Sequence, residues 1–136
     1  MSKAIKLRTD GHIEIIDVPQ QRSLLDWFYL QLGCGSIENV YPRGLKEPYM
    51  MVVDEEGLLK DHPVINFLGS YLYETQKHGH PIVGTVLVMQ RVMTWDGPDI
   101  GGIPEEEAMA LAVSIGQKLP VAIQTIKKKM GDQIKS

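Results

Sequence analysis

The strongest constraint on the fold is an Asp-Gly pair between two alternating apolar runs near the N-terminus. In "AIKLRTDGHIEIIDV", Ile5 and Leu7 alternate with polar residues before the pair, and Ile13 and Ile15 do so after it. A strand places successive side chains on opposite faces, so each run forms one apolar face. Asp-Gly supplies the tight turn that reverses the chain between them. We therefore predict two antiparallel strands, over residues 3–8 and 12–18.

The apolar runs that follow predict strands and helices in mixed order. "YMMVVD" is uninterrupted, which favours a strand buried on both faces, and "PIVGTVLVMQRV" gives the longest predicted strand. Residues 64, 67, 68, 71 and 72 are apolar and form one stripe of a helix. A further strand is predicted over 36–41, a helix over 24–32 between an N-cap at Ser23 and a C-cap at Gly33, and a helix over 63–77 with Asp61 as its N-cap, whereas "TWDGPDIGG" is predicted to be a loop.

The C-terminal part of the chain has the signals of a helix. Pro104 suits a first turn, Glu105 to Glu107 complement the positive end of the helix dipole, and Pro120 predicts a kink. We predict one α+β domain, in which a small mixed or antiparallel sheet with packed helices spans residues 1–103. Residues 104–136 then form a helical C-terminal extension of the same domain.

The extension is more apolar than one helix edge requires, which leaves two interpretations open. Its surplus could pack on the same domain or form a homo-oligomer contact. The apolar residues concerned are Met109, Leu111, Ala112, Ile115, Leu119, Ile123 and Ile126.

Composition excludes several classes of protein. The chain has 136 residues and a net charge of -3, which argues against broad electrostatic binding to nucleic acid. Its single cysteine, Cys34, cannot form an intramolecular disulfide, so nothing requires an oxidising compartment. Charged residues interrupt the N-terminal segment, and the longest apolar run is about half the length of a membrane-spanning helix. We expect a cytoplasmic protein without a membrane partner.

Three consecutive acids, Asp54, Glu55 and Glu56, end the run "YMMVVD" and raise the question of a metal site. Neighbouring strand residues point in opposite directions, whereas magnesium or calcium needs oxygen ligands that converge. Glu-Gly is also ordinary turn chemistry. We interpret the triplet as a turn.

The histidines and the cysteine give no stronger signal for a metal or a nucleophile. His78 and His80 are two residues apart, His62 is distant in sequence, and Cys34 is the only sulfur ligand of the kind that zinc prefers. The "GCG" around Cys34 is typical of a helix stop. The sequence also lacks a Walker lysine loop, a dinucleotide-type glycine pattern and a nucleophile elbow. We therefore predict no metal, no cofactor and no catalytic residue.

Trp95 is the main candidate for a binding residue. A tryptophan in a glycine-rich loop offers a large rigid contact surface, although burial in the core under the loop is the alternative. Arg91 and Asp96 lie nearby in sequence and would add polar specificity. With Glu38, these residues form the predicted ligand- or partner-binding site.

Several spaced elements of the chain resemble one family. "GSIENVYP", "YMMVVDEEGLLKDHPVINFLGSYLY" and "PIVGTVLV" occur in this order, and the matching positions are Gly35, Ile37, Glu38, Val53, Asp54, Glu55, Gly57, Lys60, Asn66, Ile82, Val83 and Gly84. The pattern is similar to the domain of unknown function 3846, found in small proteins of phages, plasmids and other mobile elements. The resemblance covers residues 3 to about 107 and implies a mobile-element setting, without established catalytic residues.

These observations lead to three functional hypotheses. The first is a non-catalytic phage or mobile-element accessory protein that binds a host protein or a small nucleotide-like ligand, for example in counter-defence. The second is a small metal-dependent hydrolase that uses Asp54, Glu55, Glu38 and the histidines. The third is a nucleic-acid-binding accessory protein that uses Lys127 to Lys129, although lysines at a helix end also complement the dipole.

Overall fold

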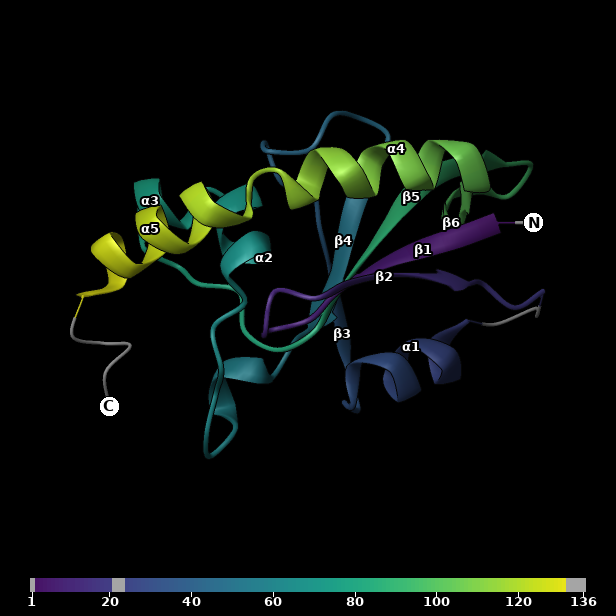
Figure 1. The fold of residues 1–136 in the computed structure, drawn as a ribbon. Helices are drawn as coiled ribbons and strands as arrows, with labels where there is room; N and C mark the ends of the chain where they lie inside the picture. The colour runs from purple at the N-terminus through teal and green to yellow at the C-terminus, as the bar shows by residue number, and fades with distance from the viewer. Residues whose placement is uncertain (1, 21–23, 132–136) are drawn as a thin grey trace.

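The computed structural model describes residues 2–20 and 24–131 and shows one antiparallel sheet with helices on both of its faces (Figure 1). The strand order is β2-β1-β5-β4-β3, with β6 paired to β5 and β7 paired to β1. Every strand pair is antiparallel, so the predicted α+β class is confirmed. The strands are β1 (Ser2–Leu7), β2 (Ile13–Asp17), β3 (Ile37–Val40), β4 (Tyr49–Asp54), β5 (Val86–Thr94), β6 (Gly97–Gly101) and β7 (Ile103–Pro104).

The N-terminal hairpin forms as predicted. Strands β1 and β2 pair from Lys3 opposite Asp17 to Leu7 opposite Ile13. Residues 8–12 connect the two strands, and Gly11 in this loop has a φ of +91°, which suits a residue without a Cβ.

Two apolar clusters form the core, one on each face of the sheet. Met51 and Val53 of β4 belong to the cluster under the later helices, whereas Met50 and Val52 belong to the cluster under α1 (Leu25–Leu32). The prediction that this strand is buried on both faces is therefore confirmed. Gly33 has a φ of +63° and ends α1 as expected, while the predicted N-cap Ser23 lies outside the described residues.

The prediction of a loop over "TWDGPDIGG" is wrong. Strand β6 pairs with the second half of β5, from Gln90 opposite Gly101 to Thr94 opposite Gly97. The first half of β5 pairs with β1 on the same side. Trp95 and Asp96 form the turn of this second hairpin, and the Asp96-Gly97 pair repeats the Asp-Gly signal of the first.

The predicted helix over 63–77 begins later and is broken. The structure has η1 (Gly57–Leu59), α2 (Phe67–Leu72) and α3 (Thr75–His78). The N-cap is Asn66 rather than Asp61, because the Asn66 Oδ1 accepts a 2.9 Å hydrogen bond from the Gly69 N–H. Glu74 adopts a φ of +64° and separates α2 from α3.

Asn66 also joins three segments of the chain. Its side chain is fully buried, and its Nδ2 donates to the Leu7 carbonyl and to the Gly84 carbonyl, each at 2.9 Å. One amide thus satisfies the end of β1, the loop before β5 and the start of α2.

The C-terminal extension consists of α4 (Glu105–Gly116) and α5 (Leu119–Met130), which meet at an angle of 50°. Pro120 lies in the first turn of α5, as the predicted kink requires. Helix α4 lies along β1 and β2, and α5 packs on α2 and α3 (Figure 1). Residues 132–136 of the predicted extension lie outside the described residues.

Packing within the domain accounts for most of the surplus of apolar residues in the extension. Ile115 and Ile126 are buried, and three further members pack against the core, whereas Met109 is exposed. In the described ranges 2–20 and 24–131, no single helix is long and apolar enough to span a membrane. Helices α4 and α5 meet that criterion only jointly, as a bent pair.

Candidate functional site

Trp95 and Asp96 form the tip of the β5–β6 hairpin. The Thr94 Oγ1 donates to the Gly97 carbonyl at 2.7 Å and accepts from the Asp96 N–H at 3.2 Å, which fixes the turn. The Trp95 side chain is 96% exposed. The interpretation of Trp95 as a core residue under its loop is therefore wrong.

Met93 and Arg91 continue the surface of this hairpin. Met93 is 75% exposed, and it shares a strand face with Arg91 because the two are separated by two positions. The Arg91 guanidinium lies over the Tyr41 ring, 5.7 Å from the ring centroid. The hairpin surface, defined as Arg91, Met93, Trp95 and Asp96, thus combines an exposed apolar end with a cation.

Glu38 does not join this hairpin surface. It lies on edge strand β3 opposite Val53, and its neighbour Ile37 packs in the cluster under α1. Because strand side chains alternate, Glu38 faces away from α1. Arg91 is two positions from Met89, which also packs under α1, so the sheet separates the two predicted site residues.

The residues proposed for a hydrolase are also dispersed. The Asp54 carboxylate, 6% exposed, pairs with the Lys60 Nζ at 2.9 Å and accepts from the Glu56 N–H at 2.9 Å. The His78 Nε2 bonds to the Tyr73 carbonyl at 2.8 Å. Across the part of the chain that the structure describes, no three His, Cys, Asp or Glu side chains gather as a metal site would require.

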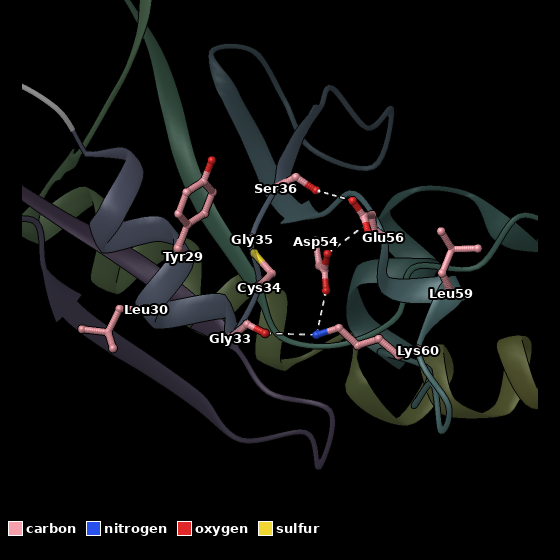
Figure 2. A pocket seen from close by; sticks show the side chains of 10 residues that line it. All are labelled: Tyr29, Leu30, Gly33, Cys34, Gly35, Ser36, Asp54, Glu56, Leu59 and Lys60. Carbon is pink, nitrogen blue, oxygen red and sulfur yellow. Dashed lines mark hydrogen bonds and ion pairs between the residues drawn. The ribbon is translucent and has the colours of Figure 1, made fainter.

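A groove of about 660 Å³ lies between the end of α1 and the turn after β4 (Figure 2). At its centre the Lys60 Nζ bridges the Asp54 carboxylate and the Gly33 carbonyl, the latter at 3.0 Å. Leu30 and Leu59 lie on opposite sides of the groove. Sequence reasoning missed this ion pair, although both of its members belong to the Val-Asp-Glu-x-Gly-x-x-Lys pattern.

The electrostatics of the groove favour a structural role. The hydrogen bond to Asp54 raises the pKa of Lys60, which keeps the ammonium charged. Burial, and secondarily Asp54, raises the pKa of Cys34, so its thiol is held in the form that is a poor nucleophile. Lys60 therefore links the end of α1 to β4. The raised pKa of Cys34 opposes the thiolate form that covalent catalysis needs.

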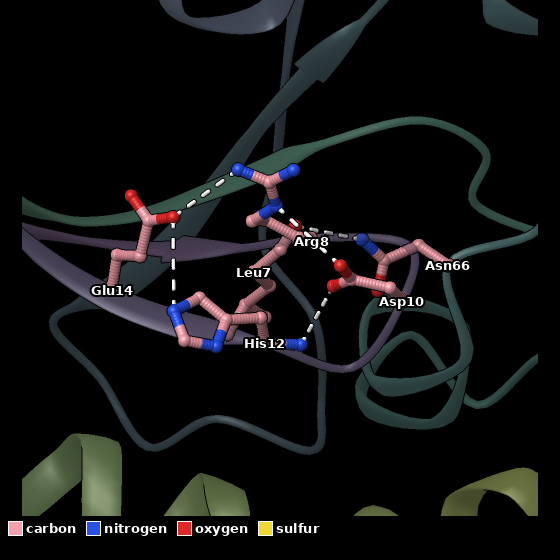
Figure 3. Close-up of polar contacts among 6 residues, drawn as sticks. All are labelled: Leu7, Arg8, Asp10, His12, Glu14 and Asn66. Carbon is pink, nitrogen blue, oxygen red and sulfur yellow. Dashed lines mark hydrogen bonds and ion pairs between the residues drawn. The ribbon is translucent and has the colours of Figure 1, made fainter.

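Polar residues around the first hairpin turn are likewise engaged with one another (Figure 3). The Arg8 Nη1 pairs with the Glu14 carboxylate at 3.3 Å, and the Asp10 Oδ1 accepts from the His12 N–H at 2.9 Å. These contacts link the two strands across the turn. The charged residues at this turn therefore have a structural role in joining the strands.

The three lysines of α5 are spread around the helix. The Lys127 Nζ lies 6.0 Å from the centroid of the Phe67 ring, whereas Lys128 and Lys129 line a shallow depression beside α3. Successive residues of a helix differ by about 100° in direction. The run therefore does not form a single basic stripe.

The sequence matches the family described as Domain of unknown function (DUF3846) over residues 1–111. The matched part spans β1 to β7 and ends within α4. No curated protein and no solved structure matches the chain significantly. Because the match covers most of the 136 residues, the chain belongs to the family of domain of unknown function 3846.

Proposed function

We propose that the protein is a non-catalytic accessory protein of a phage or another mobile element, and that it binds a host protein in the host cytoplasm. The observation that supports this proposal is the almost complete exposure of Trp95 at the tip of the β5–β6 hairpin. An exposed apolar patch is the informative feature of a protein surface, and the exposed Met93 adds to the apolar surface of Trp95 on this hairpin. The proposed contact is the hairpin surface.

Trp95 has the properties of an interface anchor. Tryptophan is enriched among residues whose truncation costs a protein complex about 2 kcal/mol or more. Here it projects from a turn that is already closed by hydrogen bonds of Thr94, so little ordering is required on binding. Met93 adds adaptable apolar surface beside it.

Sequestration of a small nucleotide-like ligand, as a form of counter-defence, is the second candidate function. It is favoured by a pocket of about 240 Å³ that lies beside Arg91 and is lined by a second arginine. This candidate would use the concave surface at the base of the hairpin rather than its tip.

Site-specific photocrosslinking tests the leading proposal. A benzoylphenylalanine residue at position 95, introduced in cells that carry the element, should give one dominant crosslinked host polypeptide. The same residue at Leu30, which is 77% exposed on α1, serves as a matched control and should not give that product. The W95A variant should lose the same polypeptide in a native purification.

Two results would contradict the proposal. One is an identical set of crosslinked products from positions 95 and 30. The other is undiminished recovery of the host polypeptide by a W95A variant whose thermal unfolding matches that of the wild type.

A further inference from the structure

The pocket beside Arg91 lies between the β3–β4 loop and the middle of β5. It has a volume of about 240 Å³, and its walls include Tyr41, Arg43, Glu47, Tyr49 and Arg91. The Arg91 N–H donates to the Pro48 carbonyl at 2.8 Å, which holds the loop against the strand. The pocket is therefore built from two segments that are fixed to each other.

Two arginines without a carboxylate partner among the described residues line this pocket. Among residues 2–20 and 24–131, no carboxylate lies within 4.0 Å of the guanidinium of Arg43 or of Arg91. Glu47 lines the same pocket but pairs with neither. The residues that line the pocket thus carry two positive charges and one negative charge. The whole chain has a net charge of -3, so the excess of positive charge is local to the pocket.

The two tyrosines that line the pocket add no negative charge that would repel an anion. Burial, and secondarily Glu107, raises the pKa of Tyr49, so its hydroxyl stays neutral and adds no negative charge. Tyr41 is 58% exposed and carries the Arg91 guanidinium near its ring. This cation–π contact holds the guanidinium beside the ring without using its N–H groups, which can still donate to a ligand.

We propose that the pocket binds the phosphate group of a nucleoside phosphate between Arg43 and Arg91. Planar guanidinium groups bind phosphate oxygens in pairs, which a single lysine cannot do. Pockets that enclose a whole drug-sized ligand have volumes of about 300 Å³ or more, so this pocket suits the phosphate end alone. The exposed Tyr41 ring offers the adjacent surface on which a base can stack.

This inference rests on the second candidate function and makes it specific. Arg91 belongs both to this pocket and to the hairpin surface. Arg43 belongs to the β3–β4 loop and not to the hairpin. Its substitution therefore separates the phosphate site from the tip of the hairpin.

Calorimetric titration at low ionic strength tests the site with ADP, with adenosine and with inorganic phosphate as separate probes. We expect saturable binding of ADP, weaker binding of phosphate and none of adenosine. Because hydrogen bonds between charged groups are each worth about tenfold in affinity or more, R43Q and R91Q should each weaken ADP binding at least to that extent. R91K keeps the positive charge but loses the paired N–H donors of the guanidinium, so it should also weaken ADP binding.

K46Q is the matched control, because Lys46 lies in the same loop but does not line the pocket. It should change ADP affinity less than about twofold, which corresponds to a surface charge effect. Circular dichroism melting of each variant should match the wild type. W95A should leave ADP binding unchanged.

Three results would overturn the inference: no saturable ADP binding at millimolar concentration, unchanged affinity in R43Q and R91Q, or equal losses in K46Q and R43Q. Native mass spectrometry of protein from carrier cells separates this failure from that of the second candidate function. A retained small molecule that persists in R43Q would place sequestration elsewhere on the protein. A wild-type protein that retains no small molecule would contradict both the phosphate site and the sequestration function.

Discussion

The two hairpins of this protein share an Asp-Gly pair at the reversal of the chain and have different surroundings. Thr9-Asp10-Gly11 and Trp95-Asp96-Gly97 each place glycine last, with φ values of +91° and +111°. The first residue of the turn is a half-buried threonine in one hairpin and a 96% exposed tryptophan in the other. Local sequence specifies the reversal of the chain, whereas neighbouring elements decide whether the turn supports the fold or is presented to solvent.

The contacts at the two tips differ accordingly. A Cβ added at Gly11 would lie 3.1 Å from a methyl carbon of Leu119 at the start of α5, whereas a Cβ at Gly97 would meet nothing within 4 Å. Next to the turn of the first hairpin, the Asn66 side chain donates to the Leu7 carbonyl. The second hairpin pairs along one strand only, since β6 contacts β5 alone in the sheet.

The largest expected effect comes from removing the amide that holds the first hairpin. N66A removes the side-chain partner of the buried Leu7 carbonyl, the part-buried Gly84 carbonyl and the buried Gly69 N–H, so we expect a loss of about 3–5 kcal/mol in the free energy of unfolding. Urea denaturation measures this loss. N39A, at an exposed position of β3, is the control and should cost less than about 0.5 kcal/mol.

The Asn66 contacts can be separated with a second variant. N66D keeps an oxygen for the Gly69 N–H but cannot donate to the two carbonyls, so it should remain strongly destabilised. If N66A stayed within about 1 kcal/mol of the wild type, the anchoring role of Asn66 would be disproved.

The second prediction compares the two turn glycines directly. G97A should cost about 1–2 kcal/mol, because a Cβ is strained at positive φ even in open space. G11A should cost roughly 1 kcal/mol more, because Leu119 must also move. Paired denaturation curves give the difference, and equal losses would show that Leu119 adapts without cost.

The smallest effect on stability is expected at the tip of the second hairpin. W95A should change the free energy of unfolding by less than about 0.5 kcal/mol, because almost none of its side chain is buried. F28A, which removes a buried ring of α1, should cost about 3–5 kcal/mol and shows that the assay detects core losses. A large loss in W95A would mean that Trp95 serves the fold after all.

Much of the fold could be predicted because local signals agreed with tertiary packing. The first hairpin has clean alternation on both sides of Asp10-Gly11, and the first turn of α4 carries Pro and three acids. The second hairpin was missed although Asp96-Gly97 repeats the signal. Pro98 and the glycines of β6 weaken strand propensity there, and pairing with β5 compensates for it.

The errors in the helix and the site have a different physical origin. Asp61 and Asn66 are both good N-cap residues, and only the burial of Asn66 against Leu7 selects it. The exposure of Trp95 follows from its place in the β5–β6 turn, and Glu38 is separated from Arg91 because β3 and β5 present them on opposite faces of the sheet. Periodicity assigns a residue to a strand face but does not order the strands.

The family match ends within α4, and this boundary bears on how the apolar surface of α2 is covered. Helix α5 lies wholly beyond residue 111, yet its Ala122 shares a core cluster with Leu68 and Leu72 of α2. A chain ending at the family boundary would leave this apolar surface of α2 in water. Removal of α5 would therefore require a polar substitution on α2 or a new cover from another subunit.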